Sequence, residues 1–189
     1  MLMKTVVVGT SYGGMNALKI VLSALPINFR APMLIVQHLS PQSNGYLIEY
    51  LNNFSKIKVK EADEKEQIRI GNAYLAPPNY HLLVDNKGFL SLTVNEKINF
   101  ARPSIDVLFE SAVDAFGSEV IGVILTGANS DGSMGLKRIK DSGGIAIVQD
   151  PKEAEADTMP RAAIKITDVD YVLPLIEIAN KLRQIVGDT

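Results

Sequence analysis

A serine in the first glycine-rich stretch of the chain is the clearest candidate for chemistry. Residues 9–13 read G-T-S-Y-G, with Ser11 at the centre. The pattern G-x-S-x-G is typical of a serine held on a sharp turn between a strand and a helix, with its hydroxyl exposed. The flanking glycines fit a bend too tight for a Cβ. Ser11 is therefore a candidate nucleophile, and the N-terminus of the helix expected from about Gly14 could stabilise a developing oxyanion.

A serine nucleophile needs a general base, and the sequence contains only two histidines. His38 directly follows the apolar run 33–37, which should bring it to the same sheet edge as Ser11. His81 precedes a predicted hairpin, and we expect it to have a structural or surface role. The sequence therefore predicts His38 as the base that accepts the serine proton.

The best candidate for the orienting carboxylate is Asp131, in the stretch T-G-A-N-S-D-G-S that follows the apolar run 120–126. An alternative role is capping of the helix expected near Ser133, and the two roles can coexist. Asp150 and Asp157 are rivals, although Pro151 after Asp150 favours a simple turn. We predict a triad in which Ser11 attacks a carbonyl, His38 transfers the proton and Asp131 orients the imidazole.

Two nucleotide-binding interpretations of the glycine turn fit less well. A dinucleotide fold would show G-x-G-x-x-G, but Ser11 stands at the middle glycine. It would also place an acidic residue at the end of the second strand, where this chain has Gln37 and His38. A P-loop requires Gly-Lys-Ser/Thr, which the turn lacks. We therefore expect no nucleotide cofactor.

Short apolar runs alternate with segments of helical periodicity along the chain. The runs are continuous rather than alternating, which is typical of parallel strands buried on both faces. The sequence predicts an α/β fold: a doubly wound, mostly parallel sheet in a three-layer αβα sandwich, with an added antiparallel hairpin around 85–88. Strands are expected at 5–8, 33–37, 56–62, 73–76, 120–126, 145–149 and 171–173, and helices at 15–25, 44–54, 104–116, 134–144, 153–166 (interrupted near Pro160) and 174–186.

Composition limits the classes of function. The chain has 189 residues, 47% of them hydrophobic, a net charge of −2 and no cysteine. That charge provides no strong attraction to nucleic acid or an anionic membrane. Cysteine chemistry is excluded, and two separated histidines with scattered carboxylates form no metal-ligand spacing. We see no signal peptide and no apolar run long enough to span a bilayer, and expect a cytoplasmic protein with no membrane insertion.

Six stretches together resemble the catalytic domain of the chemotaxis-receptor methylesterases, the CheB family. They are VVVGTSYGG, VQHLSP, AYLAPPNYH, RPSIDVLFESA, GVILTGANSDGSMGL and MPRAA, within residues 5–186. The resemblance implies a single catalytic domain over residues 1–189, without a cofactor. Its implied substrates are glutamate γ-methyl esters on the cytoplasmic helices of chemoreceptors, hydrolysed with release of methanol, and some receptor glutamines for deamidation. The family's nucleophile, base and acid correspond to Ser11, His38 and Asp131.

This chain departs from the family pattern at three places. Tyr12 stands where a small residue is usual, and its ring could narrow the entrance to the site. Ala128 and Asn129 replace methionine and glycine in the acid loop, where Asn129 should stiffen the backbone. The well-studied family architecture also has an N-terminal receiver domain, whereas this sequence begins at the catalytic domain. Two alternatives follow: the sequence is a part of a longer protein that begins at an added methionine, or the chain is freestanding, in which case we expect regulation by a separate receiver or other partner protein.

Three other functions compete with a receptor methylesterase. One is a hydrolase of another ester or amide, suggested by Tyr12 and Ala128. Another is a non-catalytic regulatory module, which the intact candidate triad disfavours. The third is a nucleotide-binding domain, disfavoured by the missing acidic residue after the second strand.

Overall fold

The computed structural model of the chain describes residues 4–38 and 45–187. Its main feature is a parallel sheet with the strand order β3-β4-β2-β1-β7-β8-β9. The central strands are β1 (Thr5–Thr10), β2 (Met33–Gln37) and β7 (Val120–Ile124), and all three are buried along their length. The outer strands are β3 (Lys58–Glu61), β4 (Asn72–Leu75), β8 (Ile145–Gln149) and β9 (Tyr171–Leu173).

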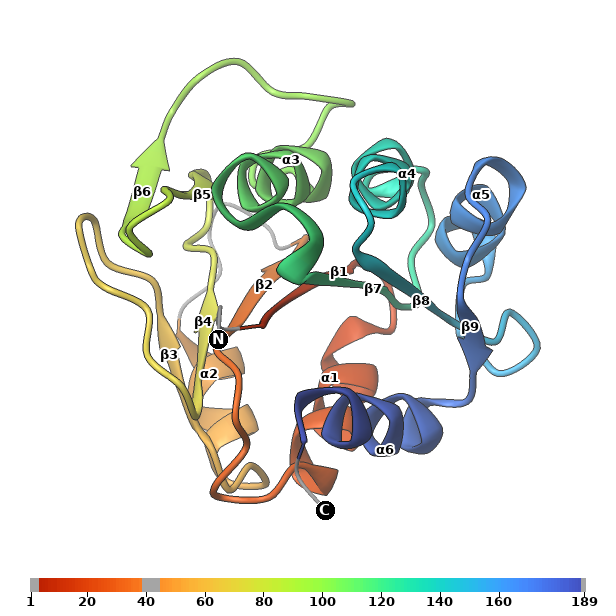
Figure 1. The fold of residues 1–189 in the computed structure, drawn as a ribbon, viewed down its shortest axis with the longest axis horizontal. Coiled ribbons are helices and arrows are strands. Elements are labelled where there is room, and N and C mark those ends of the chain that lie inside the picture. Colours follow the sequence, from red (N-terminus) through yellow and green to blue (C-terminus); the bar gives the residue numbers. More distant parts are fainter. Residues whose placement is uncertain (1–3, 39–44, 188–189) are drawn as a thin grey trace.

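Helices cover both faces of this sheet, as Figure 1 shows. One face carries α1 (Gly14–Ala24), α2 (Tyr46–Asn52) and α6 (Leu175–Val186), and the other carries α3 (Ile105–Phe116), α4 (Ser133–Asp141) and α5 (Thr158–Ile166). The predicted doubly wound, three-layer α/β fold is confirmed. Because α1 after β1 and α4 after β7 lie on opposite faces, the carboxyl ends of these adjacent strands form a topological switch point, where such sheets bind ligands.

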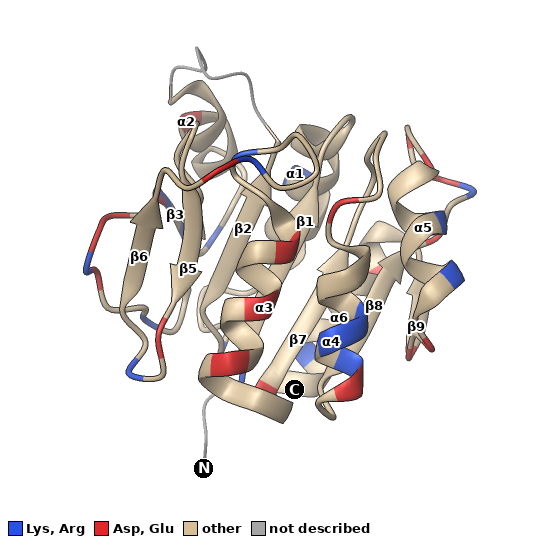
Figure 2. Ribbon diagram, turned by 90° about the horizontal axis from the view of Figure 1, so that it is seen from above, with Lys and Arg blue, Asp and Glu red and all other residues tan. Residues whose placement is uncertain are grey.

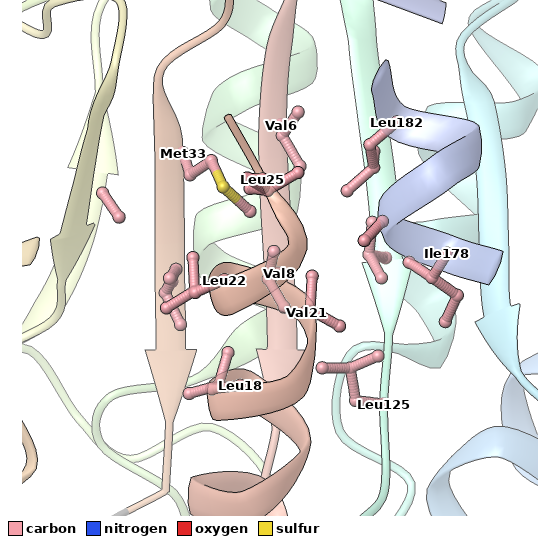
Figure 3. Close-up of a cluster of buried hydrophobic side chains, with 14 of the residues drawn as sticks. Val6, Val8, Leu18, Val21, Leu22, Leu25, Met33, Leu125, Ile178 and Leu182 are labelled. Carbon is pink, nitrogen blue, oxygen red and sulfur yellow. The ribbon is translucent and has the colours of Figure 1, made fainter. Parts of the chain in front are cut away.

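Each face of the sheet has its own apolar core. Figure 3 shows side chains of α1 and α6 meeting those of the central strands, with Leu18, Val21 and Leu22 of α1 directed at Val8 and its neighbours. On the opposite face, Leu108 and Phe109 of α3 and Leu136 of α4 are buried against the other side of the same strands. The continuous apolar strands of the sequence therefore reflect burial on both faces.

The antiparallel hairpin forms a separate small sheet beside α3. It pairs β5 (His81–Val84) with β6 (Leu90–Thr93), and the tight turn is closed by Asp85, whose side chain accepts hydrogen bonds from the N–H groups of Lys87 and Phe89. The predicted hairpin is thus confirmed. The loop that leaves β6 passes over α3 and leads into that helix (Figure 1).

The prediction for residues 153–166 was wrong in one respect. The sequence predicted a helix interrupted near Pro160, but α5 begins at Thr158 and continues without interruption to Ile166. Pro160 is the third residue of the helix, where its missing N–H has no intrahelical partner to lose. The proline therefore belongs to the start of the helix.

Charged side chains between α3 and α4 hold these two helices together at the surface. Figure 2 shows acidic residues along α3 and basic residues on the adjacent α4. Arg138 of α4 forms ion pairs with Glu110 and Asp114 of α3. Over residues 4–38 and 45–187, no helix is long and apolar enough to cross a membrane.

Candidate active site

Ser11 lies in the tight turn that joins β1 to α1. Its N–H donates to the carbonyl of Thr126, at 2.9 Å, and its carbonyl accepts from Gly14, at 2.9 Å. Gly13 has a φ of +79°, a left-handed conformation that favours glycine, and a Cβ on Gly14 would overlap the Gln37 side chain. The turn therefore excludes a side chain at both positions. Of the two glycines in the predicted pattern around Ser11, Gly13 is required by its backbone conformation, and a Cβ on Gly9 would overlap the Ile105 side chain. Helix α1 begins at Gly14, three residues after Ser11.

His38 follows the last residue of β2 and is fixed by its backbone to the neighbouring strand. Its N–H donates to the Thr10 carbonyl, at 3.1 Å. Gln37 ties the ends of the two strands together, because its Nε2 donates to the carbonyls of both Ser11, at 2.8 Å, and His38, at 2.9 Å. This role of Gln37 could not be predicted, since a buried amide that bridges two backbones leaves no signature in residue spacing.

The Asp131 side chain is fully buried and contacts the His38 imidazole. Its Oδ2 lies 2.9 Å from His38 Nε2, while 14% of the His38 side chain is exposed. The structure therefore brings the predicted base and acid together, although they are 93 residues apart in sequence.

The same carboxylate occupies the N-terminus of α3. It accepts hydrogen bonds from the N–H of Ile105, at 2.7 Å, from the N–H of Asp106, at 3.2 Å, and from the Ser104 hydroxyl, at 2.9 Å. The alternative in which Asp131 caps its own helix is wrong, because the cap position of α4 is Gly132 with no side-chain hydrogen bond. Asp131 instead caps α3, which packs beside α4 on the same face of the sheet.

These contacts decide the charge of Asp131. Burial acts to raise its pKa, but the hydrogen bond from His38 and the backbone N–H groups of Ile105 and Asp106 outweigh it, so the pKa is lowered. The neighbouring Asp106 behaves oppositely: burial and the nearby charge of Asp131 raise its pKa to about 6, against a hydrogen bond from Gly135 that lowers it. Asp131 is therefore the anionic partner of His38.

Ser11 and His38 line one cavity of about 320 Å³ at the carboxyl edge of the sheet. Within the described part of the chain, no hydrogen bond joins the Ser11 hydroxyl to His38; the structure places the two residues on the same cavity without direct contact. The distance between a nucleophile and its general base is often long in an enzyme without substrate and shortens when substrate binds. Other residues lining this cavity include Asn129, Lys97, Phe100 and Arg102.

Ser11 also lines a second cavity, of about 480 Å³. Its walls are largely apolar and include Tyr12, Met15, Tyr46, Leu47, Ile48 and Leu75. The Tyr12 ring is 66% exposed, so it stands at the rim of this cavity rather than filling it. Ser11 thus lines both a cavity with mostly polar lining residues and a larger one with mostly apolar walls.

The rival residues lie elsewhere. His81 is buried in the hairpin, where its Nδ1 accepts from the Ser104 N–H and its Nε2 contacts the Glu96 carbonyl, which fits the expected structural role. Asp150 accepts from the N–H of Lys152 in a turn, and Asp157 pairs with Arg161 at the surface. Of the carboxylates in the described ranges, Asp131 is the one that contacts His38.

A family model and the sequences of known proteins both match this chain to the same family. The family model described as CheB methylesterase matches residues 6–182. A Leptospira interrogans relative is 52% identical over 177 residues, covering 94% of this chain and 92% of its own length; it is named provisionally as a protein-glutamate methylesterase/protein-glutamine glutaminase. An Archaeoglobus fulgidus protein of that name is 38% identical over 180 residues. This chain aligns with only 52% of the Archaeoglobus protein's length.

A solved structure shares the fold. The crystal structure of the Thermotoga maritima CheB methylesterase catalytic domain superposes with a TM-score of 0.94 at 36% sequence identity. The match covers 98% of this chain and all of the Thermotoga domain.

Proposed function

The chain belongs to the CheB methylesterase family, and from this we propose that it is a serine hydrolase that removes methyl groups from glutamate γ-methyl esters of chemoreceptors. The observation that carries the proposal is the contact of His38 with the buried, anionic Asp131 at the cavity that Ser11 also lines. A nucleophile, a base and an orienting carboxylate are the groups that acyl transfer requires.

In the proposed acylation step, His38 acts through Nδ1. Its Nε2 is engaged with Asp131, so Nδ1, which lies 3.3 Å from the Asn129 amide nitrogen, is the ring nitrogen left to accept the Ser11 proton. As the Ser11 oxygen attacks the ester carbonyl, its proton passes to Nδ1, and the anionic Asp131 stabilises the resulting imidazolium. The oxyanion would be stabilised by backbone N–H groups at the N-terminus of α1 and by that of Ala128. Collapse of the intermediate returns the proton from Nδ1 to the departing methoxide, which releases methanol.

The second half of the reaction uses water. With Nδ1 again unprotonated, His38 removes a proton from a water molecule, which attacks the acyl group on Ser11. Nδ1 then returns this proton to the Ser11 oxygen as the acyl bond breaks, which releases the glutamate carboxylate and restores the serine hydroxyl. The same steps with a glutamine γ-amide would release ammonia, and the names of the relatives support this deamidation as a further activity. No step requires a metal or an organic cofactor.

The proposed partner is the cytoplasmic helical region of a methylated receptor. Exposed apolar side chains around the two cavities, including Tyr12, Met15, Tyr46 and Phe100, could contact a helix that presents its modified glutamate to Ser11. We therefore propose a cytoplasmic location for the activity. Regulation by a separate receiver protein stays a prediction.

A methanol-release assay tests this function. Receptor membranes carrying a labelled methyl group are incubated with the parent chain, with Ser11→Ala, and with Ser142→Ala as a control outside the site. We expect methanol release by the parent and by Ser142→Ala, and a loss of roughly 10⁴-fold or more in Ser11→Ala. Equal release by Ser11→Ala and the parent would contradict the assignment of the nucleophile.

A further inference from the structure

The side chain of Asn129 lies against the ring nitrogen of His38 that Asp131 leaves open. Its amide nitrogen Nδ2 is 3.3 Å from His38 Nδ1, and its amide oxygen Oδ1 is 3.1 Å from the Asp131 backbone nitrogen. A backbone N–H can only donate, so the oxygen of the amide must face Asp131. The amide NH₂ group therefore faces His38.

This orientation fixes the proton on the imidazole. An amide NH₂ can only donate, so His38 Nδ1 must be the acceptor and the ring proton must reside on Nε2. That proton points to Asp131 Oδ2, at 2.9 Å. The three residues form a closed cycle of hydrogen bonds, from Asp131 N–H to Asn129, from Asn129 to His38, and from His38 back to the Asp131 carboxylate.

The lone pair that Asn129 occupies is the one needed by the proposed reaction. In the plane of the ring, Nδ1 has a single lone pair, and the Ser11 hydroxyl must donate to it before the proton can move. In the described part of the chain it is Asn129, and not Ser11, that donates to Nδ1.

We propose that Asn129 is a positioning residue that holds the resting base neutral, with its proton on Nε2, and turns aside when Ser11 donates. This inference rests on the proposed function of Ser11 and His38. When the Ser11 proton reaches His38, both ring nitrogens carry hydrogen. The Nδ1–H would then face the NH₂ of Asn129, and two hydrogen-bond donors that face each other are unfavourable. Asn129 thus favours neutral His38, whereas Asp131 favours the charged form.

Other charged groups around His38 come from neighbouring elements. Lys97 and Arg102, in the loop between β6 and α3, line the same cavity, and Arg102 is held there by the Asn79 side chain and the carbonyls of Val94 and Asn95. Asp106 of α3 lies behind Asp131 and donates its backbone N–H to that carboxylate. All of these groups are unchanged by substitution of Asn129, so a difference between Asn129 variants isolates the amide.

The test is an NMR titration of the two histidines, which needs no substrate. It uses ¹⁵N-histidine-labelled Ser11→Ala protein with Asn129 intact, with Asn129→Ala and with Asn129→Asp. We expect the protonation midpoint of His38 to rise by about 0.5–1 pH unit in Asn129→Ala, since a hydrogen bond to the neutral form is lost. It should rise further in Asn129→Asp, where an isosteric carboxylate faces Nδ1. His81, buried in the hairpin, should be unchanged and reports intact folding.

Two results would overturn the inference: equal His38 midpoints with Asn and Ala at position 129, or ¹⁵N shifts that put the proton of neutral His38 on Nδ1. With Ser11 present, the acid limb of the methanol-release profile should move to higher pH in Asn129→Ala. Absence of any methanol release would count against the proposed function, while the NMR titration would still decide the role of Asn129.

Discussion

The Asp131 carboxylate combines a chemical and a structural role in one residue. Its Oδ2 contacts His38 Nε2 and accepts a hydrogen bond from the N–H of Ile105. Its Oδ1 accepts hydrogen bonds from the N–H of Asp106 and from the Ser104 hydroxyl. Burial alone would favour its protonated form, and these donors keep it anionic. The sequence predicted its pairing with His38 from its place after the central strand β7. Its donors from α3 could not be predicted, because they depend on how a distant helix packs.

Substitution of Asp131 by asparagine should affect rate and stability together. The new NH₂ group would face either His38 or an N–H of α3, so at least one donor would meet another donor. We expect a loss of about 10³–10⁴-fold in kcat, by analogy with the orienting aspartate of serine proteases. We also expect a decrease of about 1–3 kcal/mol in the free energy of unfolding. Methanol release and urea denaturation measure the two effects.

Asp150→Asn is the matched control for this substitution. Asp150 ends the neighbouring strand β8, but its side chain serves only a surface turn in the described contacts. Its activity should stay within about twofold of the parent. A loss confined to Asp150→Asn, with Asp131→Asn unaffected, would contradict the assignment of the carboxylate.

At the scale of elements, α3 and α4 cap one another. Asp131, just before α4, accepts from the first N–H groups of α3. In return, Asp106 in the first turn of α3 accepts from the Gly135 N–H in the first turn of α4, at 2.7 Å. Carboxylates at helix N-termini are favourable, but this exchange puts two buried carboxylates side by side. The mutual capping therefore fixes the position of Asp131 at the expense of a raised pKa for Asp106.

The raised pKa of Asp106 predicts a pH-dependent gain in stability for Asp106→Asn. A carboxyl with a pKa of about 6 in the folded protein and an ordinary value of 3.8 binds its proton more tightly when folded. The parent therefore loses stability from this group as pH rises from about 4 to 6, and the loss is complete above that range. Because asparagine keeps an acceptor for Gly135 without the charge, the variant should be more stable by about 1–3 kcal/mol at pH 8. The difference should shrink towards pH 4.

Urea denaturation at a series of pH values measures this difference. Glu96→Gln, at an exposed position in the loop between β6 and α3, controls for simple removal of a carboxylate. A constant difference between parent and Asp106→Asn from pH 4 to 8 would show that the burial of Asp106 does not control its charge.

At the scale of the whole molecule, the layers of the fold and the sheet edge that carries the candidate site were predictable from sequence. The continuous apolar runs around β1, β2 and β7 indicated parallel strands covered on both faces, and polar loops after them indicated a shared edge. Ser11, His38 and Asp131 each belong to one of these polar loops, so their gathering at one edge of the sheet could be predicted. The two cavities could not be predicted, because the rim residues Tyr12, Tyr46 and Phe100 come from three separate segments. The amide of Asn129 was expected only to stiffen its loop, and its contact with His38 depends on side-chain orientation that spacing does not specify.

The central claim is that Ser11 forms a covalent bond to the substrate acyl group, and trapping that bond tests it most directly. Methylated receptor fragment would be mixed with the parent chain, quenched in acid within milliseconds to seconds, and analysed by peptide mapping with mass spectrometry. We predict a receptor glutamyl adduct on the peptide that contains Ser11, formed with the release of methanol and absent in Ser11→Ala. Methanol release without any adduct, and equally fast in Ser11→Ala, would contradict the account.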